Sequence, residues 1–113
     1  MDLIPGSVVW ADFGEAVGRE QAGRRPAVVM STLAHLEAAD TLVTLIPCTT
    51  RTRDWPNHVV LSGQTALSEP TFAMTEQIRT VSRERVHGVR GHVSQDCLAL
   101  ITRWSQSWHL PTT

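Results

Sequence analysis

The sequence predicts an α+β domain, mainly β, in which a small, strongly bent antiparallel sheet or barrel is closed partly by a C-terminal helix. Three observations support this class. Five short segments rich in β-branched or aromatic residues are separated by turn residues, one amphipathic segment follows them, and 113 residues suffice for one core. We therefore expect residues 1–113 to form a single domain.

The first two strands are predicted at residues 7–13 and 27–30. The first segment, SVVWADF, follows a Pro-Gly turn, and the second begins after Pro26, where a missing N–H is tolerated. Between them, residues 14–24 contain three glycines and no apolar period, which predicts a long exposed loop. Ser31 is suited to cap a short helical turn after the second strand.

Three more strands are predicted before the helix. Residues 41–47, TLVTLIP, are the most β-prone stretch and predict a central strand that ends at its proline, and residues 59–61 predict a fourth strand. Residues 71–82 predict a fifth, with a bend near Glu76 that switches the buried face. Residues 83–92 are punctuated by glycine and receive no strand.

The C-terminal helix is predicted at residues 95–109. Ser94 is a suitable N-cap, and Asp96 adds a negative charge to the first turn, where the helix dipole favours it. We expect the apolar side chains of this helix to pack in the core or at a dimer interface rather than bind a ligand. They recur at spacings of three and four and are Cys97, Leu98, Leu100, Ile101, Trp104 and Trp108.

Charge and composition exclude several classes of protein. A formal net charge of −1 argues against a broad, sequence-independent grip on nucleic acid, although it permits a local basic groove. The chain has no apolar run long enough for a membrane span and no basic signal-peptide region, so a cytoplasmic location is expected. Neither the scattered histidines nor Cys48 and Cys97 have metal-ligand spacing, so we expect no metal, no other cofactor and two reduced, buried thiols.

Two polar loops are the candidates for a functional site, because both leave strands of one sheet and can lie side by side. Arginine suits phosphate, an exposed tryptophan suits base stacking, and hydroxyls suit base edges, so the two loops together fit single-stranded RNA. A solvated, ion-paired surface without function is the competing interpretation. The residues concerned are Glu20, Arg24 and Arg25 in the first loop and Thr49, Thr50, Arg51, Arg53 and Trp55 in the second. Trp10, in the first strand, is expected to be a core residue.

Three segments of the chain resemble the MazF/PemK family of toxin endoribonucleases from bacterial toxin–antitoxin pairs. They are GSVVWADFGEAVGREQAGRRPAVVMS, IPCTTRTRDWPNHVVLSG and EQIRTV, in this order over roughly residues 6–82. The resemblance implies an SH3-like or CcdB-like barrel, a homodimer, and metal-independent cleavage of single-stranded RNA at short sequences. It also implies a MazE-like antitoxin partner, whose flexible acidic tail occupies the RNA groove.

The family's functional residues carry over to Glu20 and Arg25 in the first motif and Thr49 in the second. The implied reaction is attack of a 2′-hydroxyl on the adjacent phosphate, which leaves a 2′,3′-cyclic phosphate and a 5′-hydroxyl. Glu20 is the better candidate base, Arg25 would stabilise charge on the phosphate, and Thr49 would donate its hydroxyl. Gln77 is implied as a substrate contact, and the wider expected RNA-binding set is Arg24, Thr50, Arg51, Arg53, Trp55, Gln77 and Arg79.

Two alternatives remain open. A CcdB-like toxin would poison DNA gyrase by contact through its C-terminal helix, so Trp104 and Trp108 would matter more than the loops. A homologue that binds RNA or antitoxin without cutting is kept open by departures from the family pattern. These departures are Gly14-Glu15 in place of Asp-Pro and Arg19 in place of a small residue; a third departure, Glu76 in place of Asp, bears on base preference.

Overall fold

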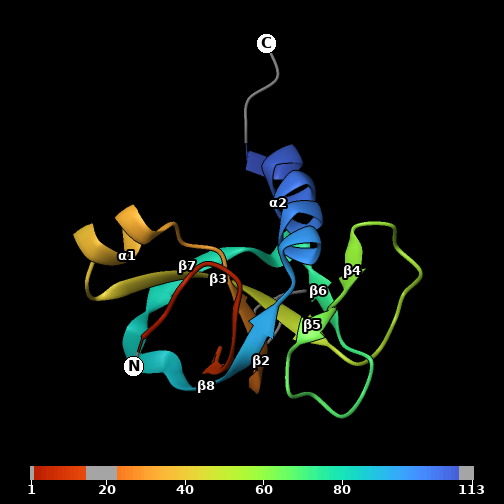
Figure 1. Cartoon of the computed structure of the whole chain (residues 1–113), viewed down its shortest axis with the longest axis horizontal. Coiled ribbons are helices and arrows are strands. Elements are labelled where there is room, and N and C mark those ends of the chain that lie inside the picture. Colours follow the sequence, from red (N-terminus) through yellow and green to blue (C-terminus); the bar gives the residue numbers. More distant parts are fainter. Residues whose placement is uncertain (1, 15–22, 110–113) are drawn as a thin grey trace.

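The computed structural model describes residues 2–14 and 23–109, the last of them by its backbone alone, and it has the expected fold class. The strands of a curled antiparallel sheet hold the largest share of these residues, and a long helix follows at the C-terminal end (Figure 1). The strands are β1 (Ser7–Asp12), β2 (Arg24–Val29), β3 (Leu42–Thr49), β4 (His58–Val60), β5 (Gly63–Gln64), β6 (Phe72–Met74), β7 (Arg79–Ser82) and β8 (Val86–Val93). The helices are α1 (Leu33–Ala38) and α2 (Gln95–His109), with 3₁₀ turns η1 (Thr75–Gln77) and η2 (Arg83–Arg85).

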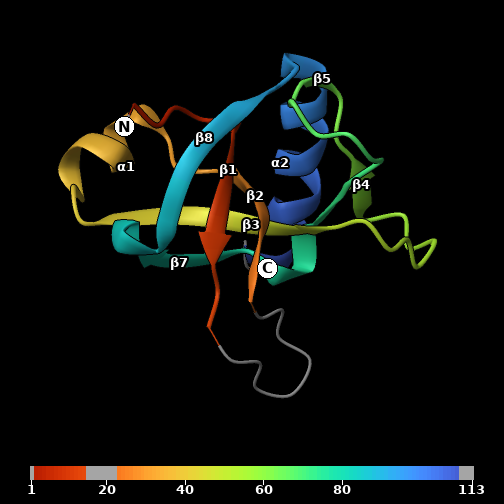
Figure 2. The same ribbon diagram turned by 90° about the horizontal axis from the view of Figure 1, so that it is seen from below.

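The long strand β3 organises the sheet. The strand order is β4-β6-β3-β2-β1-β8-β5, and β7 also pairs with β3. Residues Leu42 to Leu45 of β3 pair with β7, whereas Cys48 and Thr49 pair with β6. Figure 2 shows β8, β1 and β2 crossing over β3, which is the curl of a half-barrel.

Alternate residues of the central strands face two separate cores, as the period of a strand requires. On β1, Val8 packs in one cluster with Ile101 of α2, whereas Val9 packs in another with Leu36 of α1. All four side chains are buried. The sheet is therefore covered on both faces in its middle and can expose side chains toward the strand ends.

The predicted C-terminal helix is found as α2, over Gln95–His109. The hydroxyl of Ser94 accepts a hydrogen bond from the backbone N–H of Cys97 at 3.2 Å, as expected for an N-cap. Trp104 is half-buried against the core, whereas Trp108 is 49% exposed and donates its indole N–H to Thr75 Oγ1 at 3.3 Å. The tip of α2 is thereby tied to η1. Within the part of the chain that the structure describes, no helix is long and apolar enough to cross a membrane.

The largest error of the sequence-based assignment is residues 83–92, which were given no strand but form most of β8. This strand pairs with β1 from Ser7 to Ala11, so it completes the curled sheet. Its Gly91 does not mark a turn. A Cβ on Gly91 would lie 2.1 Å from the carbonyl oxygen of Gln64, so glycine is required there because β5 approaches closely.

Other boundaries also shift for identifiable reasons. β2 begins at Arg24 rather than after Pro26, because Asp12 of β1 pairs with Arg24. β3 continues past Pro47 to Thr49, because β6 pairs with its last two residues. The bend expected near Glu76 is η1, which separates β6 from β7.

The cap of the first helix was assigned one residue too early. Thr32 caps α1 by accepting from His35 N–H at 3.1 Å. Ser31 is buried instead, and its hydroxyl accepts from the N–H of Thr44 at 2.8 Å, which links the start of α1 to β3. The loop predicted at residues 14–24 lies for the most part outside the described residues.

Candidate functional site

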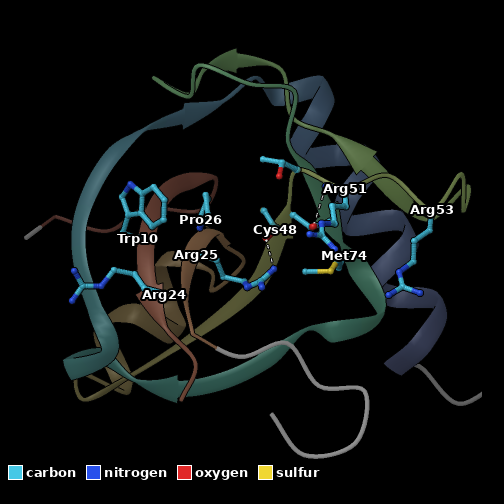
Figure 3. Close-up of a pocket in the computed structure, with 10 residues that line it drawn as sticks. Trp10, Arg24, Arg25, Pro26, Cys48, Arg51, Arg53 and Met74 are labelled. Atoms are coloured by element: carbon cyan, nitrogen blue, oxygen red, sulfur yellow. Dashed lines mark hydrogen bonds between the residues drawn. The ribbon is translucent and has the colours of Figure 1, made fainter. Parts of the chain in front are cut away.

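The described parts of the two predicted loops meet in one cleft of about 440 Å³ at the ends of β2 and β3 (Figure 3). The side-by-side arrangement expected of them is therefore found: Arg24 and Arg25 stand across from the segment that begins at Thr49. Of the described residues, those that line the cleft are Trp10, Arg24, Arg25, Pro26, Cys48, Thr49, Thr50, Arg51, Arg53 and Met74.

The cleft is basic although the whole chain has a net charge of −1. Four arginines line it, and none of the described lining residues carries a carboxylate. Figure 3 shows Trp10 and Arg24 at the side of the cleft nearest β8, Arg51 and Arg53 at the opposite side, and Arg25 between them. Such a local positive groove attracts a phosphate-bearing ligand without requiring a basic protein.

Arg25 is anchored at the centre of the cleft by the backbone of β3. Its Nη1 donates a hydrogen bond to the carbonyl oxygen of Cys48 at 3.2 Å. The β2–β3 ladder ends with Ala27 opposite Pro47, and its register, continued by one residue, sets Pro26 opposite Cys48. Because Pro26 has no N–H, it cannot donate a hydrogen bond to the carbonyl oxygen of Cys48, and the guanidinium of Arg25 donates one instead.

Burial changes the protonation of two groups in this part of the cleft. Desolvation lowers the pKa of the Arg25 guanidinium from its ordinary value, although a guanidinium starts so high that it remains charged at neutral pH. Burial raises the pKa of the Cys48 thiol far above its usual range, and the nearby Cys97 acts in the same direction. The Cys48 thiol therefore stays protonated and lines the cleft without acting as a nucleophile.

The second loop is shaped by its own hydroxyls. Thr49 Oγ1 accepts a hydrogen bond from the N–H of Arg51 at 3.1 Å, and Thr52 Oγ1 accepts from the N–H of Asp54 at 3.1 Å. Hydroxyl-to-backbone bonds of this kind hold a turn in place without a regular strand. The Thr49 hydroxyl is thus fixed at the end of β3, and Thr49 is one of the residues that line the cleft.

Three residues of the expected RNA-binding set are not among the described residues that line the cleft: Trp55, Gln77 and Arg79. Trp55 is exposed, as predicted, and stands at the rim, where the Arg53 guanidinium lies 5.5 Å from its ring centroid. The Arg79 guanidinium lies 4.5 Å from the Phe13 ring centroid, so its position is tied to the inner core. Glu20 lies outside the described residues.

Trp10 was expected in the core but is half-buried and lines the cleft together with Met74. Strand alternation places Trp10 on the same face as the buried Val8, so this pattern alone points to the core, although the partner of Trp10 on β2 is Pro26 of the arginine motif. Met74 carried no comparable signal, because it enters the cleft only through the pairing of β6 with β3.

A buried polar cluster holds the segment that follows the second loop. His58 is buried, and its Nε2 lies 2.9 Å from Oε1 of Glu76, which also accepts from Asn57 Nδ2 at 2.8 Å. His58 therefore joins β4 to η1. Among the described residues, no group of three His, Cys, Asp or Glu side chains is placed to hold a metal ion.

Comparison with known proteins identifies the family. The family model described as "PemK-like, MazF-like toxin of type II toxin-antitoxin system" matches residues 4–107. The chain belongs to this family. Endoribonuclease toxin MazF of Escherichia coli K12 is 36% identical to this MazF-like chain over 97 residues, which are 85% of this chain and 84% of the relative.

Solved MazF structures have the same fold. MazF (Form-I) from Deinococcus radiodurans superposes with a TM-score of 0.78 at 29% identity, covering 94% of this chain and 96% of that one. The MazF-like chain also matches the MazE–MazF (Form-II) structure from the same organism, with a TM-score of 0.72 at 28% identity and 93% coverage of both chains. The barrel-like sheet with a C-terminal helix, expected from the resemblance, is confirmed.

Proposed function

We propose that this MazF-like toxin is a metal-independent endoribonuclease that cleaves single-stranded RNA in the arginine-lined cleft and thereby inhibits translation and growth. The observation that carries the proposal is the convergence of Arg25 and Thr49, from separate motifs, on one basic cleft. The E. coli relative is named an endoribonuclease toxin, which agrees with this assignment.

The proposed reaction is metal-independent. The 2′-oxygen forms a bond to the adjacent phosphorus as its proton passes to a base, and the bond to the 5′-oxygen breaks as that oxygen takes up a proton from water. Arg25 donates two hydrogen bonds to the phosphate oxygens, and Thr49 donates its hydroxyl to the same group. We assign the base to Glu20, because a guanidinium is too poor an acid to exchange protons readily near neutral pH.

The remaining arginines of the cleft would hold the RNA strand on either side of the cleaved bond. Arg24 is on the β8 side, and Arg51 and Arg53 are on the opposite side (Figure 3). Thr50, which precedes Arg51 in the sequence, also lines the cleft. We propose that Trp55 continues this path by stacking a base, since its ring is exposed next to Arg53. Gln77 and Arg79 stay in the proposal as contacts to RNA that leaves the cleft.

Replacing Arg25 tests the site directly. The Arg25→Ala variant is expected to cleave single-stranded RNA about 10²–10³-fold more slowly in EDTA, because one charged donor to the transition state is lost. Arg103→Ala is the matched control, since Arg103 is an exposed arginine of α2 that does not line the cleft. Equal cleavage by Arg25→Ala and the wild type would overturn the proposal.

The same preparations distinguish the gyrase-poison alternative. We expect no inhibition of purified DNA gyrase in a supercoiling assay, and we expect RNA products that end in a 2′,3′-cyclic phosphate. Inhibition of gyrase without RNA cleavage would assign the toxin to the CcdB-like class instead.

We also propose an antitoxin partner, a homodimer and a location in the cytoplasm without membrane attachment. A MazE–MazF structure exists for the D. radiodurans relatives, and an acidic antitoxin segment would complement the four arginines of the cleft. The homodimer would bury an apolar patch over β4 and α2. Its exposed members include Val60 and Leu100, which line one shallow groove.

A further inference from the structure

A second hollow, of about 450 Å³, lies beside the cleft on the β8 side of Trp10. It shares Trp10 and Arg24 with the cleft, so the two hollows adjoin at these residues. Its outer wall is β8, which supplies His87, Gly88, Val89 and Arg90.

The Trp10 ring is accessible from this hollow. Trp10 pairs with Gly88 across the β1–β8 ladder, so the neighbour that faces it has no side chain to cover the indole. A Cβ on Gly88 would meet nothing within 4 Å, which shows that the space is open. The ladder also shifts register between Trp10 and Ala11, and such an irregularity re-aims side chains.

The polar groups around the ring are cationic or neutral. The Arg90 guanidinium lies 5.7 Å from the Trp10 ring centroid, and both Arg90 and Arg24 are exposed. His87 is also exposed, and none of the described residues that line the hollow carries a carboxylate. An aromatic ring with one guanidinium beside it and a second arginine in the same hollow is suited to a base and its flanking phosphates.

We propose that the β8 subsite, defined as Trp10, Arg24, His87 and Arg90, binds a nucleotide of the RNA strand beyond the nucleotides held at Arg25. The base stacks on Trp10, and the phosphates lie against Arg24 and Arg90. This inference rests on the proposed function. An acidic peptide would satisfy the arginines but would leave the indole face unused, and the position of the hollow directly beside the cleft favours the strand that the cleft already holds.

The subsite adds affinity for long RNA and takes no part in bond breaking. Loss of Arg90 should therefore raise KM for substrates that reach the subsite and leave kcat unchanged. It should also lower the steepness of log Kd against log salt by about 0.7, because one phosphate contact to a single strand is lost. Loss of the Trp10 ring should weaken binding of the same substrates by about fivefold or more.

The test uses the full chain and two RNA oligonucleotides with one cleavage sequence, which is mapped beforehand on a long transcript. The long oligonucleotide extends by several nucleotides on both sides of the cleaved bond, and the short one contains only the minimal sequence. Arg90→Ala is expected to raise KM for the long RNA about fivefold or more but not for the short one. Trp10→Leu removes a ring that also lines the cleft, so it is expected to raise KM for both RNAs, and more for the long one. Trp10→Phe retains a stacking ring and should stay within about twofold, whereas Arg103→Ala should match the wild type.

Each outcome decides the proposal. Equal KM changes for long and short RNA, or no change for either, would overturn the subsite. An Arg90→Ala variant that binds RNA normally but binds the antitoxin more weakly would assign the hollow to the antitoxin instead. If the wild type cleaves RNA while Arg90→Ala behaves identically, only the subsite fails; if the wild type cleaves no RNA, the proposed function itself fails. Thermal unfolding of Trp10→Leu and Trp10→Phe checks that both remain folded.

Discussion

The guanidinium of Arg25 donates a hydrogen bond to the carbonyl oxygen of Cys48, 3.2 Å away. This bond links the arginine motif on β2 to the Pro-Cys-Thr-Thr motif on β3. The carbonyl is available because its opposite residue, Pro26, has no N–H to donate. The proline of the first motif therefore helps to position the arginine that precedes it.

Pro26→Ala tests this positioning role. The new N–H would compete with Arg25 for the Cys48 carbonyl, so we expect RNA cleavage to fall roughly tenfold, mainly in kcat, with the fold retained. Pro70→Ala, at an exposed turn, is the control and should cleave at the wild-type rate. A Pro26→Ala variant with unchanged kcat would show that Arg25 is held by other contacts.

Thr75 is a buried hydroxyl on which several bonds converge. Its Oγ1 donates to the carbonyl oxygen of Asn57 at 2.8 Å and accepts from the Trp108 indole at 3.3 Å. Thr75→Val should lower the free energy of unfolding by about 1–3 kcal/mol in a urea titration, because buried partners lose their hydrogen bonds. The same substitution at exposed Thr80 should change it by less than about 0.5 kcal/mol, so equal effects at both positions would contradict this account.

The sequence predicted the elements whose apolar side chains recur at a regular spacing. It missed a strand whose residues are chosen by the close approach of another segment's backbone. The stripe that contains Cys97 and Ile101 predicted α2, because helical spacing is local information. β8 was missed because Gly91 is required only where the β5 backbone packs against it, and β5 lies far away in the sequence. A glycine in isolation predicts a turn, and only the packed partner shows that it belongs to a strand.

The candidate site shows the same division. Arg25 and Thr49 could be chosen from motif residues, and their shared cleft follows from the neighbouring strands that carry them. Trp10 was assigned to the core because a strand tryptophan is usually buried. Trp10 lies in the cleft because the helices cover only the middle of the sheet and because its partner on β8 is Gly88, which has no side chain. Neither fact can be read from the residues around Trp10 in the sequence.

Cys48 should make stability depend on alkaline pH. Burial raises the pKa of its thiol, so the folded protein keeps a proton that the unfolded chain loses above about pH 8.5. The stabilisation is complete below that pH, and the free energy of unfolding should fall by up to about 1.4 kcal/mol per pH unit above it. Urea titrations from about pH 7.5 to 10 measure this slope. Cys48→Ala should make the slope smaller, because the mutant lacks the one proton that Cys48 keeps in the folded protein and loses in the unfolded chain. Equal slopes for the two proteins would show that Cys48 does not cause the pH dependence.

The proposed homodimer gives the last prediction. Val60 of β4 and Leu100 of α2 line a shallow groove, and both are exposed, by 51% and 43%. Leu100→Glu should convert the dimer to a monomer in sedimentation velocity, because burial of an unpaired carboxylate in an apolar interface is costly. Ala99→Glu adds the same charge at an exposed neighbouring position of α2 and should remain a dimer. A dimeric Leu100→Glu variant would place the interface elsewhere on the molecule, and a monomeric wild type would contradict the proposed assembly.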